Sequence, residues 1–236
     1  MRRSKRKGDA EMALIDEKTK EQVRERLAGT LCGQVDLRLY RRPDSGPLIL
    51  PGGLACPTCD AAEELARTLT EAAPDRLSLT VIDVSQEPAE VEALPSLTMA
   101  RPGEEGRITF QGLPAGYEFA TLLDAVERVS GSGEELAPEL VERLAELESE
   151  VEVMVFVTPT CPYCPRAAAM ANRMAVASSK VRSLVVEANE YPELADRYQV
   201  QGVPRTVVNR SGAFVGALPE AMFVESVLRL ATGEAA

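Results

Sequence analysis

Apolar residues recur at helical spacing near the start of the chain and alternate with polar residues immediately afterwards. Val23, Leu27 and Leu31 follow one another at four-residue intervals, which places them on one face of a helix within residues 12–31. Residues 35–40 then alternate valine and leucine with polar side chains, the period of a half-buried strand. The chain is therefore expected to open with an amphipathic helix and a strand.

The same two periods continue through the rest of the first half. A short apolar run at 48–50 ends at Pro51-Gly52-Gly53, a sequence that interrupts regular structure. The later pattern predicts helices at 60–73 and 117–129, a helical turn at 87–93, and strands at 77–84, 97–100 and 107–111. Ser130-Gly131-Ser132-Gly133 follows and is typical of a flexible linker without packing content.

The second half repeats this order of elements. Its pattern predicts helices at 138–148, 165–178, 192–198 and 220–230, and strands at 151–157, 184–188, 206–209 and 213–216. Strand, helix, strand, an antiparallel pair and a closing helix is the order of the thioredoxin fold. We therefore predict an α/β protein of two tandem thioredoxin-like folds, each a three-layer α/β/α arrangement around a mixed sheet. The expected divisions are a disordered or extended tail at 1–11, a first domain at 12–132 and a second at 133–236.

Each predicted domain carries a Cys-x-x-Cys motif directly before a helix. Cys56 and Cys59 enclose Pro-Thr, Cys161 and Cys164 enclose Pro-Tyr, and the offset between the pairs is 105 residues. A thiolate is the attacking species in disulfide exchange, and the unpaired N–H groups and dipole of a helix N-terminus favour negative charge there. Cys56 and Cys161 are thus the expected nucleophiles, and Cys59 and Cys164 the more buried resolving thiols.

Two other uses of the cysteines stay open. Four thiolates on one zinc ion is an alternative, although both pairs enter helices and belong to separate repeats. A permanent structural disulfide is a weaker alternative, since a four-residue loop constrains the unfolded chain little. Cys32 stands outside the pairs and is expected to be a buried apolar filler.

An X-Pro pair follows each motif at the entrance of a predicted strand. These pairs are Leu94-Pro95 and Val203-Pro204. A cis bond would turn this backbone edge towards the cysteines, where it could pair with an extended substrate. An ordinary trans proline that ends a loop is the other interpretation, and composition alone favours it because cis X-Pro bonds are uncommon.

The composition removes several classes of function. The formal charge of −11 argues against a nucleic-acid binder, and the basic stretch from Arg2 to Lys7 is followed at once by acidic residues, as in a solvated tail. Histidine is absent, which excludes imidazole as a base or metal ligand. No apolar signal region or membrane span is evident, so a cytoplasmic protein is expected, with no cofactor and no membrane partner.

No proton acceptor for the thiols is obvious. The position six residues before each nucleophile holds Leu50 and Val155. Glu187, at the end of a predicted strand, is a candidate for carrying a proton from Cys164, but glutamate is usually exposed and a solvated carboxylate is the simpler interpretation.

The second motif and its surroundings identify a resemblance to a known family. Residues 156–165 read FVTPTCPYCP, and Tyr191-Pro192-Glu193 and Val203-Pro204 lie downstream. Together with residues 112–119, GLPAGYEF, they resemble the protein disulfide oxidoreductases of archaea and thermophilic bacteria, which are glutaredoxin-like proteins of two tandem thioredoxin folds. The likeness runs from about residue 12 to the C-terminus.

This resemblance implies cis bonds at Pro95 and Pro204, two redox-active sites and exchange on protein disulfides. It further implies reduction by a thioredoxin-reductase-like flavoprotein and electron delivery to a peroxiredoxin. The Pro- and Gly-rich approach at 43–53 departs from the clean strand before the second site. The chain also has no Gly-Gly-Asp stretch of the glutathione-binding kind.

The sequence therefore predicts an enzyme, a protein disulfide oxidoreductase acting through mixed disulfides. One alternative is a dedicated electron carrier between a thioredoxin-reductase-like flavoprotein and a peroxiredoxin, similar to the N-terminal domain of alkyl hydroperoxide reductase flavoproteins. The other is a zinc-binding interaction module.

Overall fold

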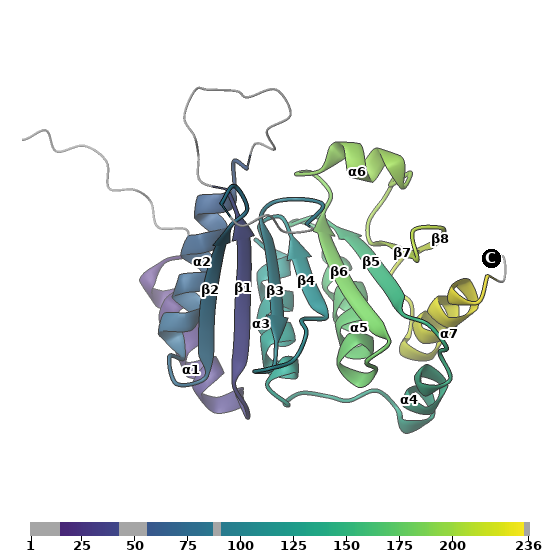
Figure 1. Cartoon of the computed structure of the whole chain (residues 1–236), viewed down its shortest axis with the longest axis horizontal. Helices are drawn as coiled ribbons and strands as arrows, with labels where there is room; N and C mark the ends of the chain where they lie inside the picture. The colour runs from purple at the N-terminus through teal and green to yellow at the C-terminus, as the bar shows by residue number, and fades with distance from the viewer. Residues whose placement is uncertain (1–14, 43–55, 87–90, 234–236) are drawn as a thin grey trace, which may run out of the picture.

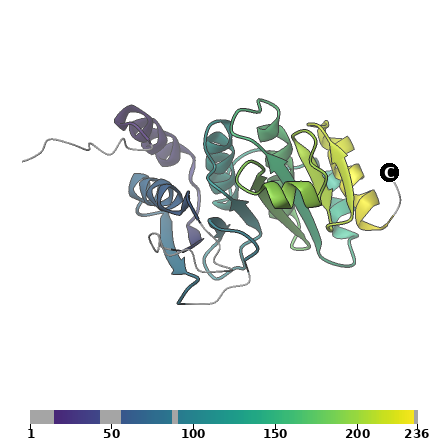
Figure 2. The same cartoon turned by 90° about the horizontal axis from the view of Figure 1, so that it is seen from above.

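The two halves of the chain share one sheet of eight strands. The computed structural model describes residues 15–42, 56–86 and 91–233. The strands lie in the order β2-β1-β3-β4-β6-β5-β7-β8, with first-half elements at one side and second-half elements at the other (Figures 1 and 2). The predicted fold class, a thioredoxin-like α/β fold with a mixed sheet, is confirmed.

The elements follow the predicted order in both halves. The first half contains α1 (Glu17–Thr30), β1 (Val35–Arg41), α2 (Cys59–Ala72), β2 (Leu77–Asp83), β3 (Ser96–Ala100), β4 (Ile108–Gln111) and α3 (Tyr117–Val129). The second contains α4 (Pro138–Ala145), β5 (Val151–Val157), α5 (Cys164–Ala177), β6 (Val181–Glu187), α6 (Pro192–Arg197), β7 (Arg205–Val208), β8 (Gly212–Val215) and α7 (Glu220–Ala231). The tail at 1–14, the run at 48–50 and most of the turn predicted at 87–93 lie outside the described residues, and 91–93 are not helical.

Strand pairing shows the duplication directly. In the first half β1 pairs with β2 in parallel and with β3 antiparallel, and β3 pairs with β4; in the second half β5, β6, β7 and β8 pair in the same way. The halves are joined by β4 and β6, which run parallel from the pair Ile108–Ser183 to the pair Gln111–Val186. Because this contact is continuous backbone pairing, the carboxyl ends of β4 and β6 lie at the same end of the sheet.

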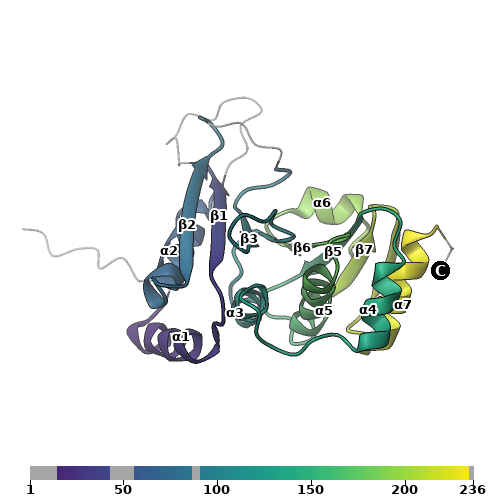
Figure 3. The same ribbon diagram turned by 60° about the horizontal axis from the view of Figure 1, so that its bottom comes forward.

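Side-chain alternation explains how the helices are distributed. Val153 and Val155 of β5 pack into the main core with α5 and α7, whereas Met154 and Phe156 point to the other face and pack with Leu194 of α6. Figure 3 shows α6 on one face and α5 and α7 on the other. The second half therefore has the predicted three layers.

The Ser-Gly tract between the halves departs from its expected lack of contacts. Ser130 is buried, its hydroxyl donates to the Glu127 carbonyl at 2.6 Å, and it accepts the Cys32 N–H at 3.3 Å. The Ser132 hydroxyl also donates to the Glu127 carbonyl. The prediction of an unattached linker was wrong here, because serine hydroxyls satisfy carbonyls that the end of α3 leaves without helical partners.

Candidate dithiol sites

The second motif lies at the start of α5 and directs backbone donors at its first sulfur. Tyr163 is the residue before the helix, and Pro165 occupies its first turn, where a missing N–H costs nothing. The Cys161 N–H donates to the Thr158 carbonyl at 3.1 Å, which closes the tight turn from β5. The Cys164 N–H then donates to Cys161 Sγ at 3.2 Å. This geometry stabilises negative charge on Cys161, as expected for a nucleophile.

The X-Pro pair closes over the same sulfur. The Val203–Pro204 bond is cis, and the Cys161 thiol donates to the Val203 carbonyl at 3.7 Å. The Leu94–Pro95 bond is also cis, so the cis bonds that the family resemblance implied are confirmed at both positions. The trans interpretation favoured by composition was wrong, since base frequencies take no account of the tertiary contacts around each proline.

The second sulfur of this motif is enclosed. Cys164 has no exposed surface, and its pKa is raised by burial, by the hydrogen bond to Cys161 and by the charge of Glu118. A thiol with a raised pKa stays protonated until a base removes its proton. Cys164 therefore has the properties of a resolving thiol that needs a proton acceptor.

Glu118 is a buried carboxyl group beside this site that the sequence analysis did not select. It lies in the first turn of α3, in the other half of the chain, and is 1% exposed. Burial raises its pKa to about 7, against the opposing effect of the nearby Thr121 hydroxyl. No hydrogen bond of normal geometry reaches either carboxylate oxygen from the described residues. A carboxyl group that titrates near neutral pH suits proton exchange with Cys164.

Glu187 differs from its expected exposure. It is 5% exposed and accepts hydrogen bonds from the N–H groups of Asn189 and Glu190. Burial raises its pKa above the ordinary value. The simpler interpretation of a solvated carboxylate was therefore wrong, because β6 ends at the junction of the two halves rather than at an open edge. Glu187 and Glu118 line one small cavity together with Gln111.

The contact between the halves at the second site requires glycine at position 116. Gly116 has φ of +59°, and a Cβ atom there would be 2.3 Å from the Pro159 carbonyl oxygen, which accepts the Tyr117 N–H at 3.0 Å. We expect Gly116→Ala to lower the free energy of unfolding by about 2 kcal/mol, because it adds a backbone clash to an unfavourable φ.

Urea denaturation of the full chain measures this effect, with Gly103→Ala as the control. Gly103 has a similar φ of +79° but open space around it, so its substitution is expected to cost about 1 kcal/mol. Equal losses in the two variants would show that the approach to Pro159 contributes nothing.

The first motif lies at the start of α2 in a different setting. Cys56 and Cys59 form a disulfide, and the Arg42 N–H lies 3.5 Å from Cys59 Sγ. Arg41, at the end of β1, pairs with Asp60 and Glu63 of α2. Cys56 comes fifteen positions after the end of β1, whereas Cys161 comes four positions after the end of β5. The segment 43–55 lies outside the described residues.

This difference in length changes which residues correspond. Leu50 was expected to match Val155, but it lies outside the described residues. Leu39 of β1 pairs with Val81 of β2 as Val155 of β5 pairs with Val185 of β6. The position that could hold a buried acid on the strand is thus apolar in both halves, and the buried acid near Cys164 comes from α3.

Cys32 is a correction to the sequence analysis. It was expected to be a buried filler, but it is exposed just after α1. Leu27 and Leu31 already fill the core on that side of the helix. Cys32 therefore provides an internal reference thiol for the reactivity of the other cysteines.

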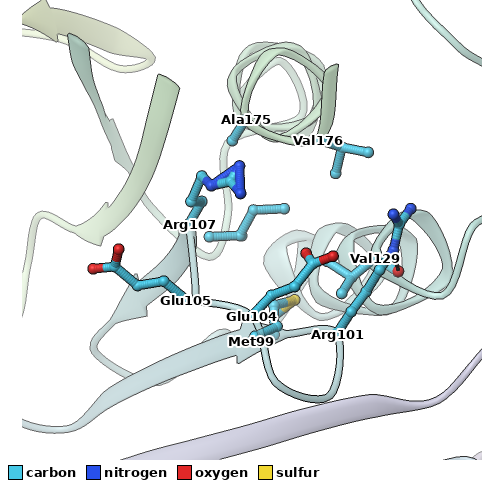
Figure 4. A pocket seen from close by; sticks show the side chains of 10 residues that line it. Met99, Arg101, Glu104, Glu105, Arg107, Val129, Ala175 and Val176 are labelled. Atoms are coloured by element: carbon cyan, nitrogen blue, oxygen red, sulfur yellow. Dashed lines mark hydrogen bonds between the residues drawn. The ribbon is translucent and has the colours of Figure 1, made fainter. Parts of the chain in front are cut away.

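Figure 4 shows a pocket at the opposite end of the strands from the cysteines. It is lined by the end of β3 and the start of β4, where Arg101 donates to the Val129 carbonyl at 3.0 Å and Arg107 points towards Ala175. Positive charge at the carboxyl ends of helices is stabilising, which accounts for both arginines. No cysteine or cis proline lines this pocket.

The zinc alternative gains no support from the geometry. Among residues 15–42, 56–86 and 91–233, no cluster of three or more acidic or cysteine side chains is placed to hold a metal ion. Within the same ranges, no helix combines the length and apolar character that a membrane crossing needs.

Comparison with known proteins agrees with the fold and the motifs. Residues 151–229 match the thioredoxin domain family. The structure of a protein disulfide oxidoreductase from Aeropyrum pernix k1 superposes with a TM-score of 0.80 at 28% identity, over 94% of this chain and 95% of that one. The alkylhydroperoxide reductase protein AhpF of Enterococcus faecalis, as a C503A mutant, gives a TM-score of 0.74 at 23% identity, over 91% and 99%; this likeness concerns the fold alone.

Curated relatives are longer proteins. The corresponding alkyl hydroperoxide reductase protein of Staphylococcus aureus strain MRSA252 is 27% identical over 150 residues, which is 64% of this chain and 28% of the relative. The match thus spans little more than a quarter of that protein. The chain described here is a tandem thioredoxin-fold protein that resembles the protein disulfide oxidoreductases, and its second half contains a thioredoxin domain.

Proposed function

We propose that the protein is a thiol-disulfide oxidoreductase that exchanges its dithiols with disulfides of other proteins. The observation that carries this proposal is the geometry at Cys161, where the helix N–H of Cys164 and the carbonyl beside a cis proline converge on one sulfur. The likeness to an oxidoreductase over nearly the whole chain supports it.

The reductive reaction has two steps. The Cys161 thiolate attacks one sulfur of a substrate disulfide, forms a mixed disulfide and releases the other sulfur as a thiolate. Cys164 loses its proton to Glu118 and attacks Cys161 Sγ, which releases the second substrate thiolate and leaves the Cys161–Cys164 disulfide. Two electrons pass from the dithiol to the substrate, and the reverse sequence oxidises a substrate dithiol.

The backbone beside each cis proline is the proposed substrate contact. Leu94 and Pro95 would serve the first site, and Val203 and Pro204 the second. Val203 is half-buried whereas Leu94 is only 4% exposed. An extended segment of substrate could pair with the Val203 backbone as an added strand. Cys56 and Cys59 would perform the same exchange in the first half.

Trapping the intermediate tests the proposal. In Cys164→Ser the resolving thiol is absent, so a mixed disulfide between Cys161 and a disulfide-containing substrate such as insulin should accumulate and dissolve on adding dithiothreitol. Cys161→Ser, with Cys164 present, is the matched control and should trap nothing at that position. Failure of Cys164→Ser to trap any adduct would contradict the resolving role.

A second candidate function is electron transfer to a peroxiredoxin. It is favoured by the sequence likeness to alkyl hydroperoxide reductase proteins, and it would place the protein in the cytoplasm between a thioredoxin-reductase-like flavoprotein and the peroxiredoxin. Peroxide turnover with a purified reductase and peroxiredoxin, together with negligible insulin reduction, would establish the carrier function over general exchange.

A further inference from the structure

Glu190 belongs to the second half but binds the first half at two points. It follows β6, and its Oε2 accepts the Thr58 hydroxyl while its Oε1 accepts the Leu113 N–H at 2.7 Å. Its own N–H donates to Glu187 Oε2 at 2.7 Å. Gly112 lies against it with φ of +90°, where a Cβ atom would be 3.1 Å from Glu190 Oε1. The carboxylate is therefore held in place from several sides.

Thr58 occupies a sensitive position in the first motif. It lies between Cys56 and Cys59, directly before the first residue of α2. A threonine there ordinarily turns its hydroxyl oxygen to the N–H groups of the first helical turn and caps them. Thr58 makes no such capping hydrogen bond, and its hydroxyl donates to Glu190 instead.

The two sites differ in this respect for a chemical reason. Tyr163 stands at the corresponding position of the second motif and is 63% exposed. Its hydroxyl lies at the far end of the ring and cannot cap the turn behind its own backbone. The donors at the start of α5 are thus left to Cys161 Sγ, as the 3.2 Å contact from Cys164 shows. Thr58 has a hydroxyl of suitable reach to compete for the same donors in α2.

We propose that Glu190 is a positioning residue of the first dithiol site, which holds the Thr58 hydroxyl away from the first turn of α2 so that its donors remain available to Cys56. This inference rests on the proposed function, because it concerns the reactivity of a nucleophile. One half of the duplicated chain then sets the reactivity of the thiol in the other half. The device is needed only at the site whose motif contains threonine.

The test compares two substitutions of Glu190 in the fully reduced, full-length protein. Glu190→Gln removes the charge but keeps polar atoms that can hold Thr58 and Leu113, whereas Glu190→Ala releases both. Alkylation of each cysteine by iodoacetamide at pH 6 is followed peptide by peptide with mass spectrometry. We expect Cys56 to react about fivefold more slowly in Glu190→Ala than in Glu190→Gln, the change that one helix-capping hydrogen bond produces.

Thr58→Val supplies the decisive control. Valine has the shape of threonine but no hydroxyl, so in its presence the difference between the alanine and glutamine variants should vanish. Cys161 should react at the wild-type rate throughout, which also verifies the fold, and Glu193→Ala, an exposed carboxylate on α6, should change neither cysteine.

Two results would overturn the inference. They are equal Cys56 rates in the two Glu190 variants, or a difference that persists with Thr58→Val. A wild-type Cys56 that reacts no faster than Cys32 would instead contradict the proposed function of the first site, so the two failures are distinguishable.

Discussion

Cys161→Ser should lower the rate of insulin disulfide reduction by about a hundredfold or more, because a serine hydroxyl cannot replace a thiolate as nucleophile. Cys56→Ser should cost less. The second site leaves Val203 half-buried and Tyr163 exposed, so an extended substrate has access to its backbone. At the first site Leu94 is buried, and the Tyr191 hydroxyl from the other half lies 3.5 Å from the Pro95 carbonyl.

Insulin turbidity with dithiothreitol as the electron source measures both losses. Cys32→Ser is the matched control, since it removes an exposed thiol outside both motifs and should leave the rate unchanged. Equal losses in Cys161→Ser and Cys56→Ser would show that the ranking of the two sites is wrong.

Glu118→Gln should change activity and stability in opposite directions. As a proton acceptor for Cys164, Glu118 must be ionised, so the wild-type rate of the resolving step should rise with pH through about 7. Glutamine accepts no proton, so the variant should be about tenfold to a hundredfold slower at pH 7.5 and should lack this rise. Single-turnover release of substrate from the mixed disulfide reports the step directly.

Stability should respond in the opposite sense. The pKa of Glu118 is about 7 in the folded chain against an ordinary value of 4.5, so the folded state holds the proton more tightly than the unfolded state. The free energy of unfolding therefore falls as pH rises from about 4.5 to 7, and the full penalty is present above that range. Glu118→Gln removes this penalty and should be more stable than the wild type at pH 8 by up to about 3 kcal/mol.

The two proteins should differ little at pH 4.5, where Glu118 is largely protonated in the folded chain. Glu139→Gln is the matched control, because it removes an exposed carboxylate from the first turn of another helix and should alter neither property. A Glu118→Gln protein with unchanged pH dependence of both activity and stability would contradict the assigned role.

The sequence predicted local features well because each depends on neighbouring residues. Helical spacing of Val23, Leu27 and Leu31 correctly indicated α1, and the repeated cysteine motifs correctly indicated two helices that begin at Cys59 and Cys164. The two cis prolines came from the family resemblance rather than from the residues themselves.

Features that depend on the joining of the halves could not be predicted. The pairing of β4 with β6 brings Glu118 of the first half to the second site and Glu190 of the second half to the first site. Nothing in the sequence around either glutamate signals a partner in the other half. The burial of Glu187 was missed for the same reason, since an isolated second domain would have left the end of β6 open.

The central claim is that the start of α5 activates Cys161 as a nucleophile. Its most direct measurement compares the alkylation rates of Cys161 and Cys32 in the same fully reduced protein at pH 6. Cys161 is only 9% exposed and Cys32 is exposed, so access alone favours Cys32. The account predicts that Cys161 reacts at least tenfold faster despite its burial; a Cys161 rate equal to or below that of Cys32 would contradict it.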